Sequence, residues 1–274
     1  MKLAIVTDEI SQDFSTACEL AARWGLRAIE VRMVAGGRVP RIPRQDWGRL
    51  RDTAQSFGLE IVSVSPGLLK APPDSPEFAA HTRGLADDSF ALARVLGVSR
   101  LIVFGGVKGE HRASEPPPHG LGDVPDELLE ALNSLAERAE AAGATLLLEN
   151  EAGCYADTGL RTAQVVCQVS HPALRVNWDP GNDYKTSELP FPDGYEHVKA
   201  SISHVHVKDG VKESGSFRFL PLGEGEIDWL GQLKALRRDG YDGYLVVETH
   251  CGPKVTASEK CVQNLEKMLG KLEE

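Results

Sequence analysis

The feature that most constrains the fold is an eightfold alternation of short apolar runs and longer segments with helical periodicity. Short apolar runs bounded by turn residues are typical of buried strands, whereas apolar residues three and four apart predict amphipathic helices. Strands that alternate with helices imply a parallel sheet with crossover helices. Eight such units in 274 residues indicate an α/β fold, a closed (β/α)8 TIM barrel. An open doubly wound sheet is the alternative, but no Gly-x-Gly-x-x-Gly follows the first predicted strand.

The predicted units follow one another with short connections. We predict strands at residues 3–7, 28–32, 61–65, 101–104, 145–149, 174–178, within 203–209, and at 243–248. We predict helices at 14–24, 44–57, 76–96, 125–142, 158–169, 227–238 and 256–272, with a weaker one near 194–200. Because no linker or charge run separates the units, we predict a single barrel domain over residues 1–274.

One segment, residues 107–122, interrupts this rhythm. It contains glycines, His111, His119 and the run Pro116-Pro117-Pro118, so we predict a loop without regular structure. The loop follows the fourth predicted strand and should emerge at the face where barrel enzymes bind substrate. Its composition permits closure that excludes water, so we predict a lid; plain exposed loop histidines are the alternative.

Composition and charge narrow the range of functions. The formal net charge of -10 and the pI of about 5.4 argue against nucleic acid or an anionic membrane as partner. Five cysteines, odd in number and without Cys-x-x-Cys, fit a reducing compartment. The apolar start of the chain is broken by Asp8 and Glu9, too early for a signal peptide or a membrane span. We expect a soluble cytoplasmic protein; a homo-oligomer is an option that the sequence leaves open.

Acidic and imidazole side chains end the last four predicted strands. In barrels of this type the active site lies at the carboxyl ends of the strands. The residues at those ends are Glu149, Asp179, His206 and Glu248. Each carboxylate alone could be a solvated strand end, but all four side chains should converge at one mouth. A divalent cation would relieve the repulsion among the carboxylates. Three oxygen donors and one imidazole suit Mn²⁺, Mg²⁺ or Co²⁺, and Zn²⁺ is also compatible.

The stretch Ser203-His204-Val205-His206-Val207-Lys208-Asp209 alternates polar and apolar residues. Alternation places His204, His206 and Lys208 on one face of a strand. Two histidines in this pattern can also be satisfied core residues. Lys208 is a candidate substrate-binding residue, with an ion pair to Glu226 or Asp209 as the alternative.

Two further strand ends supply weaker candidates. Glu30 is a candidate substrate-binding residue at the second strand, where it and Arg32 could line the mouth, although an ion pair between strands is equally compatible. His250 lies two residues beyond Glu248 and therefore on the same face. It is also a candidate substrate-binding residue, with a supporting or solvent-exposed position as the alternative.

Four motifs resemble those of the xylose-isomerase-like barrels, a superfamily with sugar isomerases, ketose 3-epimerases, inosose dehydratases and endonuclease IV. The motifs are Leu146-Leu147-Leu148-Glu149-Asn150, Asn177-Trp178-Asp179-Pro180-Gly181-Asn182, His204-Val205-His206-Val207-Lys208-Asp209 and Val246-Val247-Glu248. The resemblance covers nearly the whole chain. It implies that Glu149, Asp179, His206 and Glu248 are metal ligands. It also implies that Glu149 and Glu248 are catalytic, since the ketose 3-epimerases use glutamates at these positions as proton-transfer bases on opposite faces of the substrate.

The chain departs from the epimerases at Asn182. The epimerases carry a histidine three residues after the ligand aspartate, whereas this chain carries an asparagine there. An asparagine can hydrogen-bond a hydroxyl but cannot accept a proton at neutral pH, so Asn182 is a candidate substrate-binding residue. The additional histidine ligands of endonuclease IV have no counterparts that we can place, which together with the acidic charge disfavours DNA repair.

The resulting prediction is a metal-dependent isomerase or epimerase that acts on a small polyol or keto-sugar, or on a sugar phosphate. The metal would chelate the carbonyl and adjacent hydroxyl oxygens and stabilise an enediolate, and a glutamate would move the proton. One alternative is a lyase of the inosose or dehydroshikimate dehydratase kind. Another is a barrel that binds a sugar without turnover.

Overall fold

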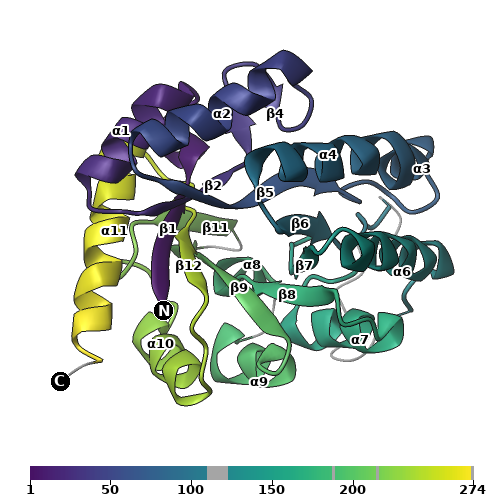
Figure 1. Ribbon diagram of the computed structural model, residues 1–274. Coiled ribbons are helices and arrows are strands. Elements are labelled where there is room, and N and C mark those ends of the chain that lie inside the picture. Colours follow the sequence, from purple (N-terminus) through teal and green to yellow (C-terminus); the bar gives the residue numbers. More distant parts are fainter. Residues whose placement is uncertain (110–122, 187–188, 214–215, 273–274) are drawn as a thin grey trace.

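The computed structural model describes residues 1–109, 123–186, 189–213 and 216–272. Eight parallel strands close into a barrel in the order β1, β12, β9, β8, β7, β6, β5, β2 (Figure 1), which confirms the predicted (β/α)8 barrel. The barrel strands are β1 (Lys2–Val6), β2 (Ala28–Val31), β5 (Glu60–Leu68), β6 (Arg100–Phe104), β7 (Thr145–Glu149), β8 (Leu174–Trp178), β9 (Ile202–Val207) and β12 (Tyr244–Val247).

Helices form the outer layer around these strands (Figure 1). The helices are α1 (Phe14–Arg23), α2 (Arg44–Ser56), α3 (Pro76–Ala80), α4 (Ala86–Leu96), α6 (Asp126–Ala141), α7 (Gly159–Val169), α8 (Pro180–Lys185), α9 (Tyr195–Val198), α10 (Trp229–Arg238) and α11 (Lys254–Gly270). Side-chain caps fix where several of them begin: Asp13 accepts a hydrogen bond from the Thr16 N–H, and Thr158 accepts one from Arg161 N–H.

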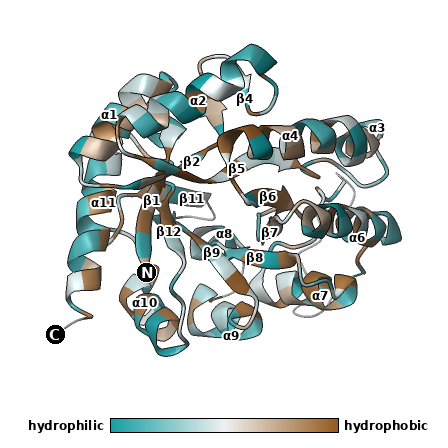
Figure 2. Cartoon of the chain, in the orientation of Figure 1, coloured by the Kyte–Doolittle hydropathy of each residue, from teal (hydrophilic) through white to brown (hydrophobic). Residues whose placement is uncertain are grey.

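Strand alternation sorts apolar side chains into two cores, because successive side chains of a strand point to opposite faces. On β1, Ala4 and Val6 belong to a small apolar cluster inside the barrel, whereas Ile5 belongs to the large cluster between the strands and the helices. On β9, Val205 and Val207 join that outer core, which leaves the imidazole of His206 on the inner face. Figure 2 shows brown, apolar stretches on strands such as β5 and β6, within a layer of helices that carry both brown and teal segments.

Three local features differ from the sequence-based expectation. The predicted helix 76–96 contains a π-helical turn, His81–Leu85, between α3 and α4; Gly84, a poor helix former, lies within it. Two antiparallel strand pairs were not predicted, because their strands are short or largely polar. They are β3 (Met33–Val34) with β4 (Gly37–Arg38), and β10 (Asp209–Glu213) with β11 (Ser216–Leu220).

The predicted lid lies mostly outside the described residues, since the description stops at residue 109 and resumes at 123. His111 and His119 are therefore not placed. The first residue of that segment, Val107, forms an isolated antiparallel bridge with Cys154. Among the described helices, none is sufficiently long and apolar to cross a membrane.

Candidate metal and substrate site

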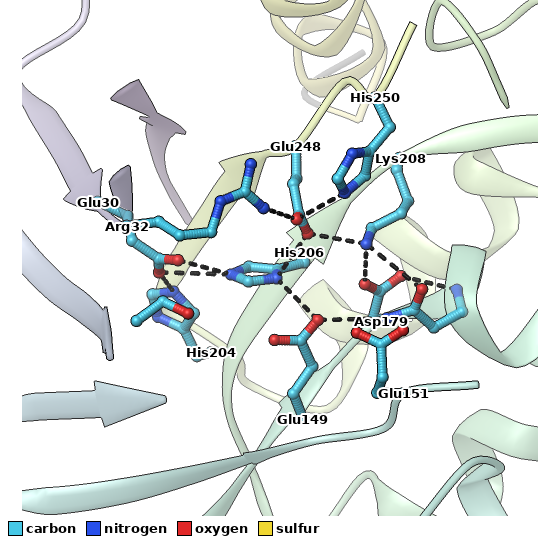
Figure 3. A network of polar contacts seen from close by, with 12 residues as sticks. Glu30, Arg32, Glu149, Glu151, Asp179, His204, His206, Lys208, Glu248 and His250 are labelled. Carbon is cyan, nitrogen blue, oxygen red and sulfur yellow. Dashed lines mark hydrogen bonds and ion pairs between the residues drawn. The ribbon is translucent and has the colours of Figure 1, made fainter. Parts of the chain in front are cut away.

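The four residues predicted as metal ligands meet at the carboxyl end of the barrel (Figure 3). Glu149 ends β7, Asp179 caps α8 directly after β8, His206 is the penultimate residue of β9, and Glu248 follows β12. Each is at most 3% exposed. One ligand-type atom from each residue lies within 4.8 Å of the others. The sequence therefore predicted correctly that these side chains converge, while metal binding itself stays a prediction.

His206 lies at the centre of this acid–histidine cluster, the name we use for Glu149, Asp179, His206 and Glu248. Its Nδ1 atom lies 3.0 Å from Glu248 Oε2 and 3.5 Å from Glu149 Oε1. Its Nε2 atom lies 3.2 Å from Glu30 Oε1 on the opposite side of the ring. The ring thus presents one nitrogen to the cluster and is oriented by a carboxylate through the other, a common arrangement for metal-ligating histidines.

Lys208 supplies positive charge inside the cluster. Its Nζ lies 2.6 Å from Asp179 Oδ2 and 2.8 Å from Glu248 Oε2. The predicted alternative of a pair with Glu226 or Asp209 is wrong, because the lysine side chain continues the inner face of β9 into the mouth. A Cβ atom at Gly181 would overlap the Lys208 side chain, so the absence of a side chain at this position in α8 is what gives Lys208 its path.

Burial and charge shift the pKa values of these groups in different directions. Burial raises the pKa of Asp179 to about 6, against the opposing charge of Lys208. At Glu248 the effect of burial is outweighed by the charges of Lys208, His206 and Arg32, which hold its pKa well below the ordinary value. Burial likewise opposes the protonated form of His206, but neighbouring carboxylates, Glu30 first, keep its pKa well above the ordinary value. The buried carboxylates are therefore balanced by cationic side chains.

Asn182 lies on the first turns of α8 and faces the cluster. It is fully buried, and its Nδ2 donates to Glu149 Oε1 at 3.2 Å. Its Oδ1 lies 3.4 Å from the Nζ atoms of both Lys185 and Lys208. Asn182 also lines the pocket described below, so the structure brings this predicted substrate-binding residue to the site.

Glu30 occupies a different place from the one expected of a substrate-binding residue. It is fully buried, accepts a 2.6 Å hydrogen bond from Ser63 Oγ, and lies 3.1 Å from His204 Nε2 as well as beside His206. It does not belong to the described pocket lining. The predicted alternative of an ion pair between strands is confirmed for Arg32, whose guanidinium contacts Asp8, Glu9 and Glu248. The contacts of Glu30 favour a role in orienting His206.

His250 lies at the rim, where its side chain is 34% exposed. Its Nε2 lies 2.8 Å from Glu248 Oε1, and its backbone N–H donates to Glu9 Oε2 at 2.9 Å. The ring packs against Phe219, with centroids 5.0 Å apart. Its φ of 52° is a left-handed conformation that non-glycine residues rarely adopt, and the contacts to Glu9 and Glu248 hold it there.

Above the cluster lies a small polar pocket of about 180 Å³, equivalent to about six waters at about 30 Å³ each. Its size suits a small polyol. It is lined by Arg32, Arg38, Ser65, Lys70, Phe104, Glu149, Glu151, Asn182, Lys185, His206, Lys208, Phe219, Glu248 and His250.

Several of these lining residues escaped the sequence analysis. Glu151 lies two residues beyond Glu149, and Lys185 lies three residues beyond Asn182 on the same helix, so spacing alone could have identified both. Arg38 and Phe219 lie on the two unpredicted strand pairs. No motif marks them, and only the folded chain brings them to the mouth.

Comparison with known proteins gives one family and several distant relatives. The family model described as xylose isomerase-like TIM barrel matches residues 18–269. An inosose dehydratase of Bacillus licheniformis is 29% identical over 198 residues, which make up 65% of this chain and 63% of that protein. Similar matches include one that covers 50% of the relative, so the chain spans about half to just under two thirds of the curated relatives it matches.

Two solved structures illustrate the structural likeness. The probable 3-DHS dehydratase AsbF of Bacillus anthracis superposes with a TM-score of 0.77 at 18% identity, covering 97% of this chain and 99% of that one. The D-allulose 3-epimerase of Methylomonas sp., solved in complex with D-allulose, gives 0.74 at 17% identity, covering 98% and 97%. At these identities the likeness establishes the fold alone.

Proposed function

Because the chain belongs to the family of xylose isomerase-like TIM barrels, we propose that it is a metal-dependent isomerase or epimerase of a small polyol or keto-sugar. Its first chemical step is removal of a proton from a carbon beside a carbonyl. The observation that carries this proposal is the buried acid–histidine cluster at the floor of a small polar pocket. Epimerisation and dehydration can both begin with this step, and they differ only in the later ones.

The donor set fits a divalent ion. Ligand atoms about 2.0–2.2 Å from one ion lie at most about 4.4 Å apart, and the four atoms here already lie within 4.8 Å of one another. Three carboxylates and one imidazole suit Mg²⁺, Mn²⁺ or Co²⁺ better than a thiolate-seeking metal. Glu149, Asp179, His206 and Glu248 would hold it. When bound, such an ion supplies Lewis acidity that polarises a carbonyl and stabilises the negative charge of an enediolate.

The two glutamates are unequally suited to take the proton. Glu248 is contacted by Arg32, His206, Lys208 and His250. Glu149, by contrast, has Asn182 and His206 as its contacts among the described residues. Each neighbouring cation makes a carboxylate a weaker base, so Glu149 is the better candidate to accept the substrate proton. In an epimerase Glu248 would then act from the other side, with the C–H electron pair moving to the carbonyl oxygen and back.

Dehydration is the second candidate function, and the same asymmetry favours it. A dehydratase needs a single base, Glu149, and an acid that protonates the departing hydroxyl. This hydroxyl is bonded to the carbon beyond the one that loses its proton, so it lies on the second carbon from the carbonyl carbon. Cationic neighbours keep Glu248 ionised, so His250, which contacts it at 2.8 Å, is the described group available to supply that proton. The hydroxyl leaves with it as water, and a carbon–carbon double bond remains. The curated relatives are named inosose dehydratases, which agrees with this outcome.

One experiment separates these outcomes. Purified protein is supplied with Mn²⁺ and a panel of ketoses and cyclic ketopolyols in D₂O, and the products are followed by NMR and mass spectrometry. Deuterium beside the carbonyl without loss of water supports isomerisation or epimerisation, whereas loss of one water supports dehydration. Turnover of a substrate without either change, once slow exchange from a shielded base is excluded, would overturn proton abstraction and favour a hydride shift. Saturable binding without turnover would leave only a sugar-binding barrel.

A further inference from the structure

One wall of the pocket carries an arginine, Arg38, for which no ion pair with a described carboxylate is found. Arg38, Ser65, Lys70 and Phe104 form this wall, which we call the Arg38 corner. The Arg38 Cζ lies 5.8 Å and the Lys70 Nζ 4.4 Å from the centre of the Phe104 ring, so both cations lie against one aromatic side chain. Arg38 also donates to Ser65 Oγ at 2.8 Å. The four residues therefore form one contiguous surface of the pocket.

Three other cations of the pocket, Arg32, Lys70 and Lys208, are matched by carboxylates at close range. Arg32 contacts Asp8, Glu9 and Glu248, and Lys208 contacts Asp179 and Glu248. Within the corner, Lys70 lies 2.8 Å from Glu151 Oε2. These groups already have ionic partners within the chain and need none from a ligand.

Arg38 differs from them, because its described partners are neutral. Its Nε donates to the Ser65 carbonyl and its Nη2 to Ser65 Oγ, both at 2.8 Å, which uses two of the five guanidinium N–H donors. No described carboxylate oxygen lies within ion-pair distance of it. Burial and the charge of Arg32 lower the pKa of Arg38, and the carboxylates of Glu149 and Glu248, which form no ion pair with it, only partly oppose this. An anion in direct contact with the guanidinium would therefore be favoured electrostatically.

Lys185, on the other side of the mouth, also lacks a described carboxylate partner, but its surroundings differ. Its Nζ lies 4.5 Å from the centre of the Phe219 ring and 3.4 Å from Asn182 Oδ1. It follows β8, and Arg38 follows β2, which are separated by four steps around the barrel in either direction. One small anionic group cannot contact both Arg38 and Lys185, so the anionic group of a ligand should bind at one of the two walls.

We propose that the Arg38 corner binds an anionic group, so that the substrate is a polyol or keto-sugar bearing a carboxylate or a phosphate. Arg38 presents a planar donor fork that matches either group, and Lys70 and Ser65 Oγ add donors beside it. A neutral sugar would leave this partly buried charge unmatched, which is costly. The chain has a net charge of -10, so an anionic substrate needs such a local cationic surface to enter.

The proposed reaction of the anionic substrate rests on the proposed function, whereas the binding of an anion at the Arg38 corner does not. The test therefore measures binding alone. Isothermal titration compares three hexoses that differ at one carbon: glucose, glucuronate and glucose 6-phosphate. Each is titrated into the wild-type protein and into Arg38→Met and Lys185→Met variants, which lose the charge but keep an apolar stem. Lys199→Met is the matched control, since Lys199 is exposed, pairs with Glu196 and does not line the pocket. Thermal melting verifies the fold of every variant.

We expect at least one charged hexose to bind about tenfold or more tightly than glucose, in line with the strength of hydrogen bonds to charged groups. Tighter binding of glucuronate indicates a carboxylate, and tighter binding of glucose 6-phosphate indicates a phosphate. The preference should vanish in Arg38→Met, persist in Lys199→Met and weaken with added salt. Should Arg38→Met fail to fold, its role is tested by Arg38→Lys, which should keep part of the preference.

Three results would overturn the proposal: glucose binding as tightly as both charged hexoses, no measurable binding of either charged hexose to folded protein, or a preference lost in Lys185→Met but not in Arg38→Met. These results are distinct from failure of the proposed function. Deuterium exchange into a neutral ketose could still be observed without any anion preference, and anion preference could be observed without exchange.

Discussion

The two ends of the barrel are built from the same eight strands but carry opposite kinds of cavity. At the amino end, a depression of about 680 Å³ is lined by Lys2, Leu3, Arg27, Glu60, Tyr244 and neighbours from α11. At the carboxyl end, the pocket of about 180 Å³ holds buried carboxylates, imidazoles and ammonium groups in mutual contact. The larger cavity therefore has fewer buried charged groups that could take part in chemistry.

The polar contacts at the amino end are weak contacts at the protein surface, which contribute to stability and do not indicate a functional site. Tyr244 Oη donates to the exposed Glu60 at 3.1 Å, and Lys2 and Arg100 lie over the Tyr244 ring at 5.4 and 5.5 Å. Such contacts each contribute little and are reachable by water. Buried charges at the carboxyl end cost folding free energy and must be kept for another purpose. The difference teaches that desolvated charge, more than volume, identifies a site.

Replacing Glu149 by Gln should give the largest effect and provides the sharpest test of this comparison. Loss of a general base typically lowers rates by about 10²–10⁴-fold, and the nearly isosteric amide should leave the barrel folded. The rate of deuterium exchange into the substrate and the melting temperature would be measured together. An exchange rate equal to that of the wild type would remove Glu149 from the mechanism.

Replacing His206 by Ala should weaken metal binding by at least about a hundredfold, since even outer partners of metal ligands contribute about 10–100-fold. Glu30→Gln, which changes only the orienting carboxylate, should fall within that smaller range. Metal content after purification without chelator, followed by competition with a chromophoric chelator, would measure both. Retention of metal by His206→Ala as tight as the parent's would refute the ligand assignment.

Metal affinity should also depend on pH. In protein stripped of metal, burial raises the pKa of Asp179 to about 6, and its proton must leave before the carboxylate can ligate. Affinity should therefore fall as the pH drops through about 6. The free energy of unfolding of the metal-free protein should change in the opposite direction. Because the pKa of Asp179 is higher in the folded than in the unfolded state, its protonation stabilises the fold at low pH, and this contribution is lost as the pH rises through about 6. A metal affinity that does not change between about pH 5 and 7 would contradict the expected loss of affinity at low pH.

At the amino end, Tyr244→Phe should give the smallest effect. It removes one partly exposed hydrogen bond, so we expect a loss of roughly 0.5 kcal/mol in unfolding free energy and no change in metal affinity or exchange rate. Urea unfolding would measure the stability. A marked loss of activity with intact metal binding would show that the two ends are not independent.

The sequence predicted the barrel and its ligand-type residues because each depends on short-range patterns. The four residues lie at or directly after the carboxyl ends of strands, and parallel strands necessarily present these ends at one edge; they are Glu149, Asp179, His206 and Glu248. The partners of Lys208 could not be predicted in this way. They depend on closure of the barrel, which places β8 and β12 on either side of β9 and so brings two carboxylates within reach of one ammonium group.

Arg38 escaped prediction for a related reason. It lies on a two-residue strand, β4, whose pairing with β3 is too short to leave a periodic signal in the sequence. Its orientation is fixed by Ser65 on the neighbouring β5, a contact between residues 27 positions apart. The position of a side chain on such a short element depends on tertiary contacts, so it cannot be predicted from sequence patterns alone.

Lys208 has a consequence for how the barrel balances its buried charges. By lying between Asp179 and Glu248, this ammonium group provides the chain with an internal counter-ion for its most crowded carboxylates. The folded barrel therefore does not depend on an ion to balance these charges, in contrast to small zinc domains whose folding requires the metal. An ion that binds at the proposed metal site would have to compete with this lysine. The identity of that ion would then depend on the supply in the compartment as much as on the preference of the site.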